Sequence, residues 1–228
     1  MMTAAIFLLA LLIPRSSPVD LEMEGRLWEA GVAYEEAGNR AGRMRVTCRL
    51  LENALYAGHP FRSARLIDEL AGMGAEATEL GIWRARLARV CGLGSLAAER
   101  LEELSGPGWA GRRAAGLWLL YTQRPDEAVD ALAEAYTAAG SHMERYYAAV
   151  DMTFALLAAD RPVLALEAAD SLCSAMPGDG LCAVLRCLCL HGAGRYGEAM
   201  TTLDSLASAP AAGAGPSSMA AALLGELQ

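Results

Sequence analysis

The chain contains no lysine: all 19 of its basic residues are arginine, and 27 acidic residues leave a formal net charge of -8. Neither a phosphate-gripping lysine nor a Schiff-base lysine is therefore available. The first 113 residues hold 14 arginines and 14 acids, and the remainder hold 5 arginines and 13 acids. The chain is thus expected to present no broad basic face, and nucleic acid is not an expected partner.

Strand-forming residues are also scarce. Aromatic residues make up only 6% of the 228 residues, β-branched residues are few, and 46 residues are alanine. Alanine favours helices, whereas β-branched and aromatic residues favour strands. With 54% hydrophobic residues, the composition excludes a disordered chain and a collagen-like rod. We expect an all-α protein.

Catalytic motifs are missing as well. The sequence contains neither His-Glu-x-x-His nor Gly-x-Ser-x-Gly, and no motif pairs its three histidines with a nucleophile. Residues 72–77 match Gly-x-Gly-x-x-Ala, but a helical pattern precedes them where a dinucleotide-binding fingerprint needs a strand. We predict that the chain is not an enzyme and binds no cofactor.

The six cysteines show no disulfide-framework spacing, and four of them lie between residues 173 and 189. Cys182, Cys187, Cys189 and His191 form the strongest candidate metal site. On a helix, however, Cys182 and Cys189 lie within about 20° of each other, with Cys187 and His191 on nearly the opposite face. We interpret these cysteines as small packing residues and predict no metal site. A disulfide after export, or a metal or redox site that includes Cys173, is the alternative.

The amino terminus carries an uncharged run of ten residues, Ala4 to Ile13. A helix of this length is too short to span a membrane, so no transmembrane span is expected, but it matches the hydrophobic part of a secretory signal. No arginine precedes the run, Arg15 follows it, and no Ala-x-Ala site precedes Pro18. We predict an exported, periplasmic or cell-envelope protein. A cytoplasmic protein is the alternative, in which the run packs against the fold or translation starts at Met23.

Internal repetition sets the expected architecture. Five short segments share a final alanine that follows a helical stretch and a turn and precedes a second helical stretch. Their alanines are spaced 34, 30, 37 and 34 residues apart. These anchors are Ala64, Ala98, Ala128, Ala165 and Ala199.

This pattern resembles the tetratricopeptide repeat, a helical hairpin of about 34 residues with small residues where its two helices cross. The match is best in the last three units, where the small residue of the first helix falls on Gly116, Thr153 and Cys187. The second unit departs from it, because Arg86 and Arg89 occupy apolar positions. The resemblance implies a right-handed α-solenoid. Its predicted parts are an N-terminal hydrophobic segment (1–19), a capping helix (20–42), the repeats (43–210), and a linker with a C-terminal capping helix (211–228).

In the resembled family the first helices of the hairpins line a concave groove, so the resemblance implies a non-catalytic adaptor that binds a protein or peptide there. The scaffold subunit of an enzyme complex and a self-associating structural protein are the alternatives, and the sequence leaves the oligomeric state open. The groove positions transferred from the family are Arg49, Asn53, Tyr56, Arg113, Leu117, Tyr121, Tyr147, Val150, Phe154, Val184, Leu188 and His191. The alternative for Tyr147, Phe154 and Leu188 is packing between neighbouring hairpins or under the C-terminal helix.

Overall fold

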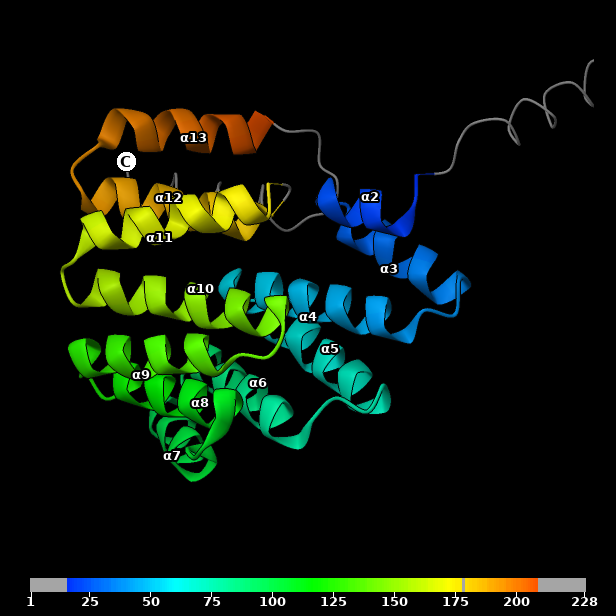
Figure 1. The fold of residues 1–228 in the computed structure, drawn as a ribbon, viewed down its shortest axis with the longest axis horizontal. Coiled ribbons are helices and arrows are strands. Elements are labelled where there is room, and N and C mark those ends of the chain that lie inside the picture. Colours follow the sequence, from blue (N-terminus) through cyan, green and yellow to red (C-terminus); the bar gives the residue numbers. More distant parts are fainter. Residues whose placement is uncertain (1–15, 178, 209–228) are drawn as a thin grey trace, which may run out of the picture.

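A computed structural model of the chain describes residues 16–177 and 179–208. These residues form twelve α-helices and no strand, which confirms the expected all-α class. Consecutive helices pack against each other in chain order. In Figure 1, α10 to α13 lie above α7 to α9, α2 to α5 lie toward the right, and α6 lies between α5 and α8.

Ten of the described helices form five hairpins, each made of a first and a second helix. The first helices are α4 (Arg40–Tyr56), α6 (Ala77–Val90), α8 (Gly108–Tyr121), α10 (His142–Ala158) and α12 (Gly180–Gly192). The second helices are α5 (Pro60–Gly72), α7 (Gly94–Leu104), α9 (Pro125–Ala138), α11 (Pro162–Ala175) and α13 (Tyr196–Ser208).

The turn inside each hairpin repeats one backbone conformation. The residue two positions before each second helix has a positive φ, with values between 56° and 81°. Glycine fills this position in three hairpins, but Gln123 and Asp160 fill it in the third and fourth. A residue in the left-handed backbone conformation ends a helix and redirects the chain. All five hairpins therefore share the same turn geometry between their two helices. The five residues are Gly58, Gly92, Gln123, Asp160 and Gly194.

A small residue is buried at the fourth position of every second helix, where the two helices of the hairpin cross. Ala128, Ala165 and Ala199 hold this place in the last three hairpins, as the sequence pattern predicted. In the first two hairpins the prediction was one residue late. Ser63 and Ala97 are fully buried there, while Ala64 and Ala98 are partly exposed. Since both positions carry small residues, composition alone could not fix the register.

Gly116 on α8 shows how closely the helices of a hairpin approach. A Cβ atom added to it would lie 2.5 Å from Cγ of Leu132 on α9, which is far inside van der Waals contact. Glycine at this predicted small position therefore lets the two helix backbones come together. The connection between the second and third hairpins is short, because α7 ends at Leu104 and α8 begins at Gly108.

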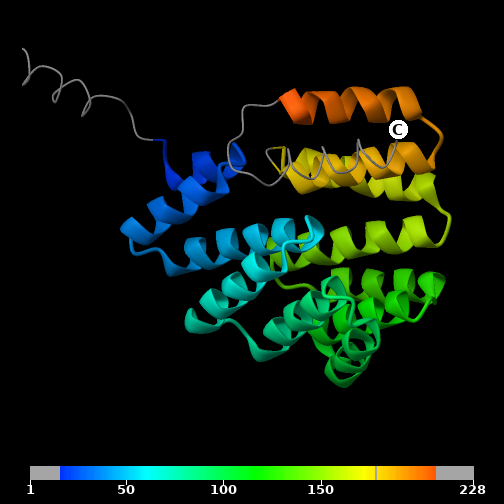
Figure 2. The same cartoon turned by 180° about the vertical axis from the view of Figure 1, so that it is seen from behind.

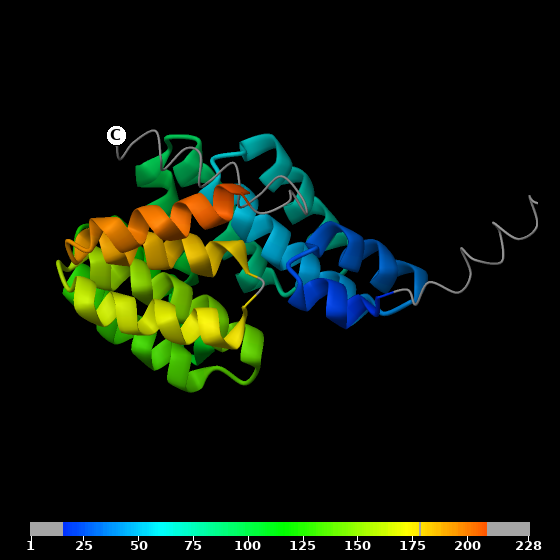
Figure 3. The same ribbon diagram turned by 90° about the horizontal axis from the view of Figure 1, so that it is seen from above.

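The N-terminal cap consists of two helices, α2 (Pro18–Met23) and α3 (Leu27–Glu36), where the sequence pattern predicted one. Gly25, with a φ of 75°, separates them. Ser17 and Asp20 begin α2 with a reciprocal capping box. Figure 3 shows both helices at one side of the molecule. The hydrophobic run at 4–13 and the expected C-terminal helix lie outside the described residues.

The first helices form an inner layer. Each contacts the next first helix along the chain, and the last turn of α4 also reaches α10, where the Tyr56 and Phe154 rings stack at 4.8 Å. Figure 2 shows the end of α4 beside α10 from behind. The largest apolar cluster accordingly includes buried residues of α4, α6, α10 and α12. We call the surface of these first helices the inner face.

Candidate functional site

A ring of four buried charges lies at the centre of the inner face. Glu52 on α4, Arg86 on α6, Arg113 on α8 and Asp151 on α10 are each at most 5% exposed. Arg86 Nη1 lies 2.9 Å from Glu52 Oε1 and 3.8 Å from Asp151 Oδ1. Arg113 Nε donates to Asp151 Oδ2 at 2.6 Å, and its Nη2 lies 3.4 Å from Glu52 Oε1. Each of four consecutive first helices thus contributes one charge, and the signs alternate around the ring in the order Glu52, Arg86, Asp151 and Arg113.

The ring is packed among aromatic side chains. The guanidinium carbon of Arg113 lies 4.9 Å from the Trp83 ring centre and 5.0 Å from that of Tyr147. Within the described chain, Glu52 Oε2, Arg113 Nη1 and Trp83 Nε1 have no hydrogen-bond partner. Burial raises the pKa of Glu52, and the opposing charges of Arg86 and Arg113 do not fully offset it. Buried ion pairs add little net stability but strongly penalise loss of one partner, so the ring fixes how the four helices are placed.

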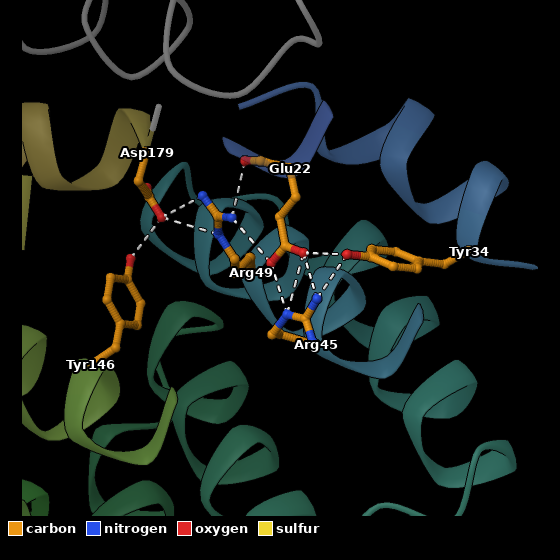
Figure 4. A network of polar contacts seen from close by, with 6 residues as sticks. All are labelled: Glu22, Tyr34, Arg45, Arg49, Tyr146 and Asp179. Atoms are coloured by element: carbon orange, nitrogen blue, oxygen red, sulfur yellow. Dashed lines mark hydrogen bonds and ion pairs between the residues drawn. The ribbon is translucent and has the colours of Figure 1, made fainter. Parts of the chain in front are cut away.

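A second network joins the cap to the far end of the inner face (Figure 4). Arg49 on α4 donates to Asp179 Oδ2 at 3.0 Å from Nη2 and lies 3.4 Å from Glu22 Oε1 on α2. Asp179 also accepts from the Tyr146 hydroxyl at 3.0 Å and from the backbone N–H of Leu181, which caps α12. Three segments far apart in the sequence therefore meet at one guanidinium.

Glu22 is held in its charged form on the other side of this network. It accepts from Arg45 Nη2 at 2.7 Å and from the Tyr34 hydroxyl at 3.0 Å. Burial alone would raise the pKa of Glu22, but the hydrogen bonds and charge of Arg45 lower it below the usual value. The cap is therefore fastened to α4 by an ionised carboxylate.

A cluster of three partly exposed aromatic side chains and one exposed arginine lies one to two helical turns C-terminal of the charge ring. The Tyr56 ring stacks on Phe154 with an angle of 15° between the ring planes. Arg86 covers Tyr56 at 4.9 Å, and Arg89 covers Tyr121 at 4.1 Å. We call Tyr56, Arg89, Tyr121 and Phe154 the aromatic rim. Like the ring beneath it, the rim takes one side chain from each of α4, α6, α8 and α10.

The twelve positions expected to line a groove differ in how far their side chains are exposed. Six side chains are buried and have no surface to offer a partner, five are partly exposed, and His191 is exposed. The buried six are Arg49, Arg113, Leu117, Tyr147, Val150 and Val184. The partly exposed five are Asn53, Tyr56, Tyr121, Phe154 and Leu188.

Sequence reasoning missed most of the two charge networks. It noted Arg86 as out of place on an apolar face and did not single out Glu22, Glu52, Asp151 or Asp179. The available signal was the recurrence of both charge signs at core-facing positions of consecutive first helices. Positions 49, 52, 86, 113 and 151 all carry such charges, and buried charges need partners of opposite sign.

The cysteines pack as small apolar residues. Cys182, Cys187 and Cys189 are buried on α12, and all six cysteines are unpaired. Burial raises the pKa of Cys187 to about 11, so the thiol is protonated at neutral pH. Among the described residues, no three His, Cys, Asp or Glu side chains come together as metal ligands.

Comparison of the chain with protein-family models finds no match, and comparison with curated proteins finds no relative. Of the helices that the structure describes, none is both long and apolar enough to cross a membrane.

Proposed function

We propose that this protein is a non-catalytic adaptor that binds a protein or peptide segment on its inner face, at the aromatic rim. The single observation that carries this proposal is the placement of the rim. Four partly or fully exposed side chains from four separate helices gather in one place above a rigid charge ring.

Rigid aromatic side chains suit this role because they offer a large contact area with little conformational entropy to lose on binding. The Tyr56 and Phe154 rings are already stacked, and Tyr121 is already covered by Arg89. The arginine adds hydrogen-bond donors at the edge of an otherwise apolar surface. A short apolar segment that carries an acidic residue fits this combination best.

Site-specific substitution tests the proposal. Immobilised protein is used to capture partners from the native host's lysate, and Tyr121→Ala and Phe154→Ala should each reduce capture strongly. Phe61→Ala and Tyr196→Ala are matched controls, because these side chains are 93% and 59% exposed on the second helices α5 and α13. Unchanged capture by the Tyr121 and Phe154 variants, with the helical circular-dichroism signal intact, would reject the rim as the binding site.

We further propose that the hairpins are tetratricopeptide-like and wind as a right-handed solenoid at the cell envelope. The recurrent left-handed turn and the buried small residue in all five hairpins support the family resemblance. The localisation rests only on the hydrophobic run at residues 4–13. The intact mass of the protein from its native host would show whether this segment is cleaved.

Self-association is the second candidate function, and one observation favours it. Two apolar side chains on α2 and two on α3, each pair four residues apart, are between 39% and 56% exposed. Sedimentation at several concentrations would show association, and Trp28→Ala should then abolish it. The residues of this patch are Val19, Met23, Trp28 and Val32.

A further inference from the structure

A concave pocket lies between the third and fourth hairpins, away from the aromatic rim. It has a volume of about 230 Å³ and is lined by residues of α9, α10 and α11. Its apolar lining includes Ala149, Met152 and Ala168, and Arg145 and His142 are exposed in the first turns of α10. Small-molecule sites combine a mainly apolar lining with a few convergent polar groups. The pocket has this composition.

The charges around the pocket are of one sign. None of its lining residues is acidic, although the chain as a whole carries a net charge of -8. Within the described chain, Arg145 forms no ion pair. On the flanking helices, Glu134 pairs with Arg112 and Asp170 pairs with Arg186.

The acidic residue next to Arg145 in the sequence, Glu144, also has hydrogen-bond partners of its own. Glu144 accepts hydrogen bonds from the backbone N–H groups of Gly140 and Ser141, and so closes the capping box of α10. Arg145 therefore keeps its donors available at the mouth of an apolar pocket. A ligand with a negative charge on an apolar body would satisfy both parts of the site.

We propose that this pocket binds a small apolar carboxylic acid, with the carboxylate on Arg145 and the hydrocarbon part against Ala149, Met152 and Ala168. The volume lies below the roughly 300 Å³ at which pockets for drug-sized ligands begin, so the acid is short. The C-terminal residue of a polypeptide carries the same chemistry. Its backbone would need further space in this small volume, although the Ser171 and Tyr136 hydroxyls line the pocket and can accept from its N–H.

The inference does not depend on the adaptor function, because none of the aromatic-rim residues lines the pocket. The probe is 4-methylpentanoate, titrated into the full chain and followed by ligand-observed NMR and by the methyl resonance of Met152. We expect saturable binding at about millimolar concentration or tighter, with a shift of the Met152 methyl and none of the Met44 methyl on α4. The neutral isostere 4-methylpentanamide should bind at least about tenfold more weakly.

Two substitutions, Arg145→Gln and Ala168→Leu, test separately how the arginine charge and the cavity contribute to binding, and Arg84→Gln is the control. Arg145→Gln should weaken binding by at least about tenfold, whereas Arg84→Gln, which removes another exposed arginine outside the pocket, should leave it within about twofold. Ala168→Leu should fill the cavity and lower affinity for both probes. Because Arg145 is exposed, its replacement is not expected to disturb folding.

Three results would overturn the proposal. They are no saturable binding up to about 10 mM acid, equal binding of acid and amide, and an affinity that Arg145→Gln leaves unchanged. A leucine-terminated peptide with a free carboxylate provides the last arm of the experiment. If it bound more than about tenfold tighter than the acid with the same dependence on Arg145, the site would instead belong to a polypeptide terminus.

Discussion

Arg49 and Asp179 are separated by 130 positions in the sequence, yet the Arg49 Nη2 atom lies 3.0 Å from Asp179 Oδ2 and both side chains are only 2% exposed. This pair joins the first hairpin to the start of the last one. A solenoid held only by neighbouring repeats has no such contact. The pair makes the inner face a closed unit whose stability should depend on both ends of the chain.

Loss of this pair should be costly. Asp179→Asn retains an oxygen that can cap α12 but leaves Arg49 with a buried charge facing a neutral amide. We expect the free energy of unfolding to fall by about 3–5 kcal/mol, measured by denaturant unfolding. Arg186→Gln is the control, since it removes a pair in which the arginine is 32% and Asp170 is 52% exposed and should cost less than about 1 kcal/mol. Equal effects of the two substitutions would contradict the role given to Arg49.

The charge ring should show strong coupling between its members. Glu52→Leu alone leaves Arg86 and Arg113 sharing one carboxylate, and we expect it to destabilise the protein by about 3–5 kcal/mol. Adding Arg86→Met restores the charge balance and should recover most of that loss, as a double-mutant cycle would measure. Simple additivity of the two single effects would show that the ring does not act as a unit.

Replacing a non-glycine residue that has a left-handed backbone conformation should stabilise the protein. Gln123 and Asp160 adopt φ values of 63° and 56°, where a side chain is strained. Gln123→Gly should raise the free energy of unfolding by up to about 1 kcal/mol, because relief of strain exceeds the added entropy of the unfolded chain. In the opposite sense, Gly58→Ala at a φ of 68° should destabilise the first hairpin. Thermal melts of the two variants should shift in opposite directions.

Acid should loosen the N-terminal cap through Glu22. The pKa of Glu22 is lower in the folded protein than in the unfolded chain, so the unfolded chain takes up the proton more readily as the pH falls. The resulting stability is fully present above the unfolded value of about 4.3 and is lost as the pH falls through the folded value.

The test compares the parent protein with Glu22→Gln across pH. The difference in the free energy of unfolding should be largest near neutral pH and should shrink below about pH 4.5. A difference that grew on acidification would contradict the ionised carboxylate assigned to Glu22.

Much of the fold could be predicted from the sequence because its determinants are local. Alanine content, turn residues and a spacing near 34 identify helical hairpins, and Gly116 marks a crossing on its own. The register of the first two hairpins could not be fixed, since Ser63 and Ala64 are equally suitable in size. The helix break at Gly25 was missed because the apolar pattern continues across it.

The site was less accessible to sequence reasoning. The family positions included Tyr56, Tyr121 and Phe154, which lie on the inner helices. Whether these side chains form a groove or pack together depends on how far the inner helices close. That closure is set by pairs such as Arg113 with Asp151, 38 positions apart. No local pattern pairs such charges, so Arg49 and Arg113 were expected on an open surface and are instead buried.

Photo-crosslinking at the aromatic rim tests the adaptor proposal most directly. A photoreactive phenylalanine analogue replaces Phe154 in one variant and Phe61, which is 93% exposed on α5, in the other, and both are irradiated in the native host. We expect one defined crosslinked partner from position 154 and none of that identity from position 61. The same product from both positions, or none from position 154 while position 61 yields one, would contradict binding at the inner face.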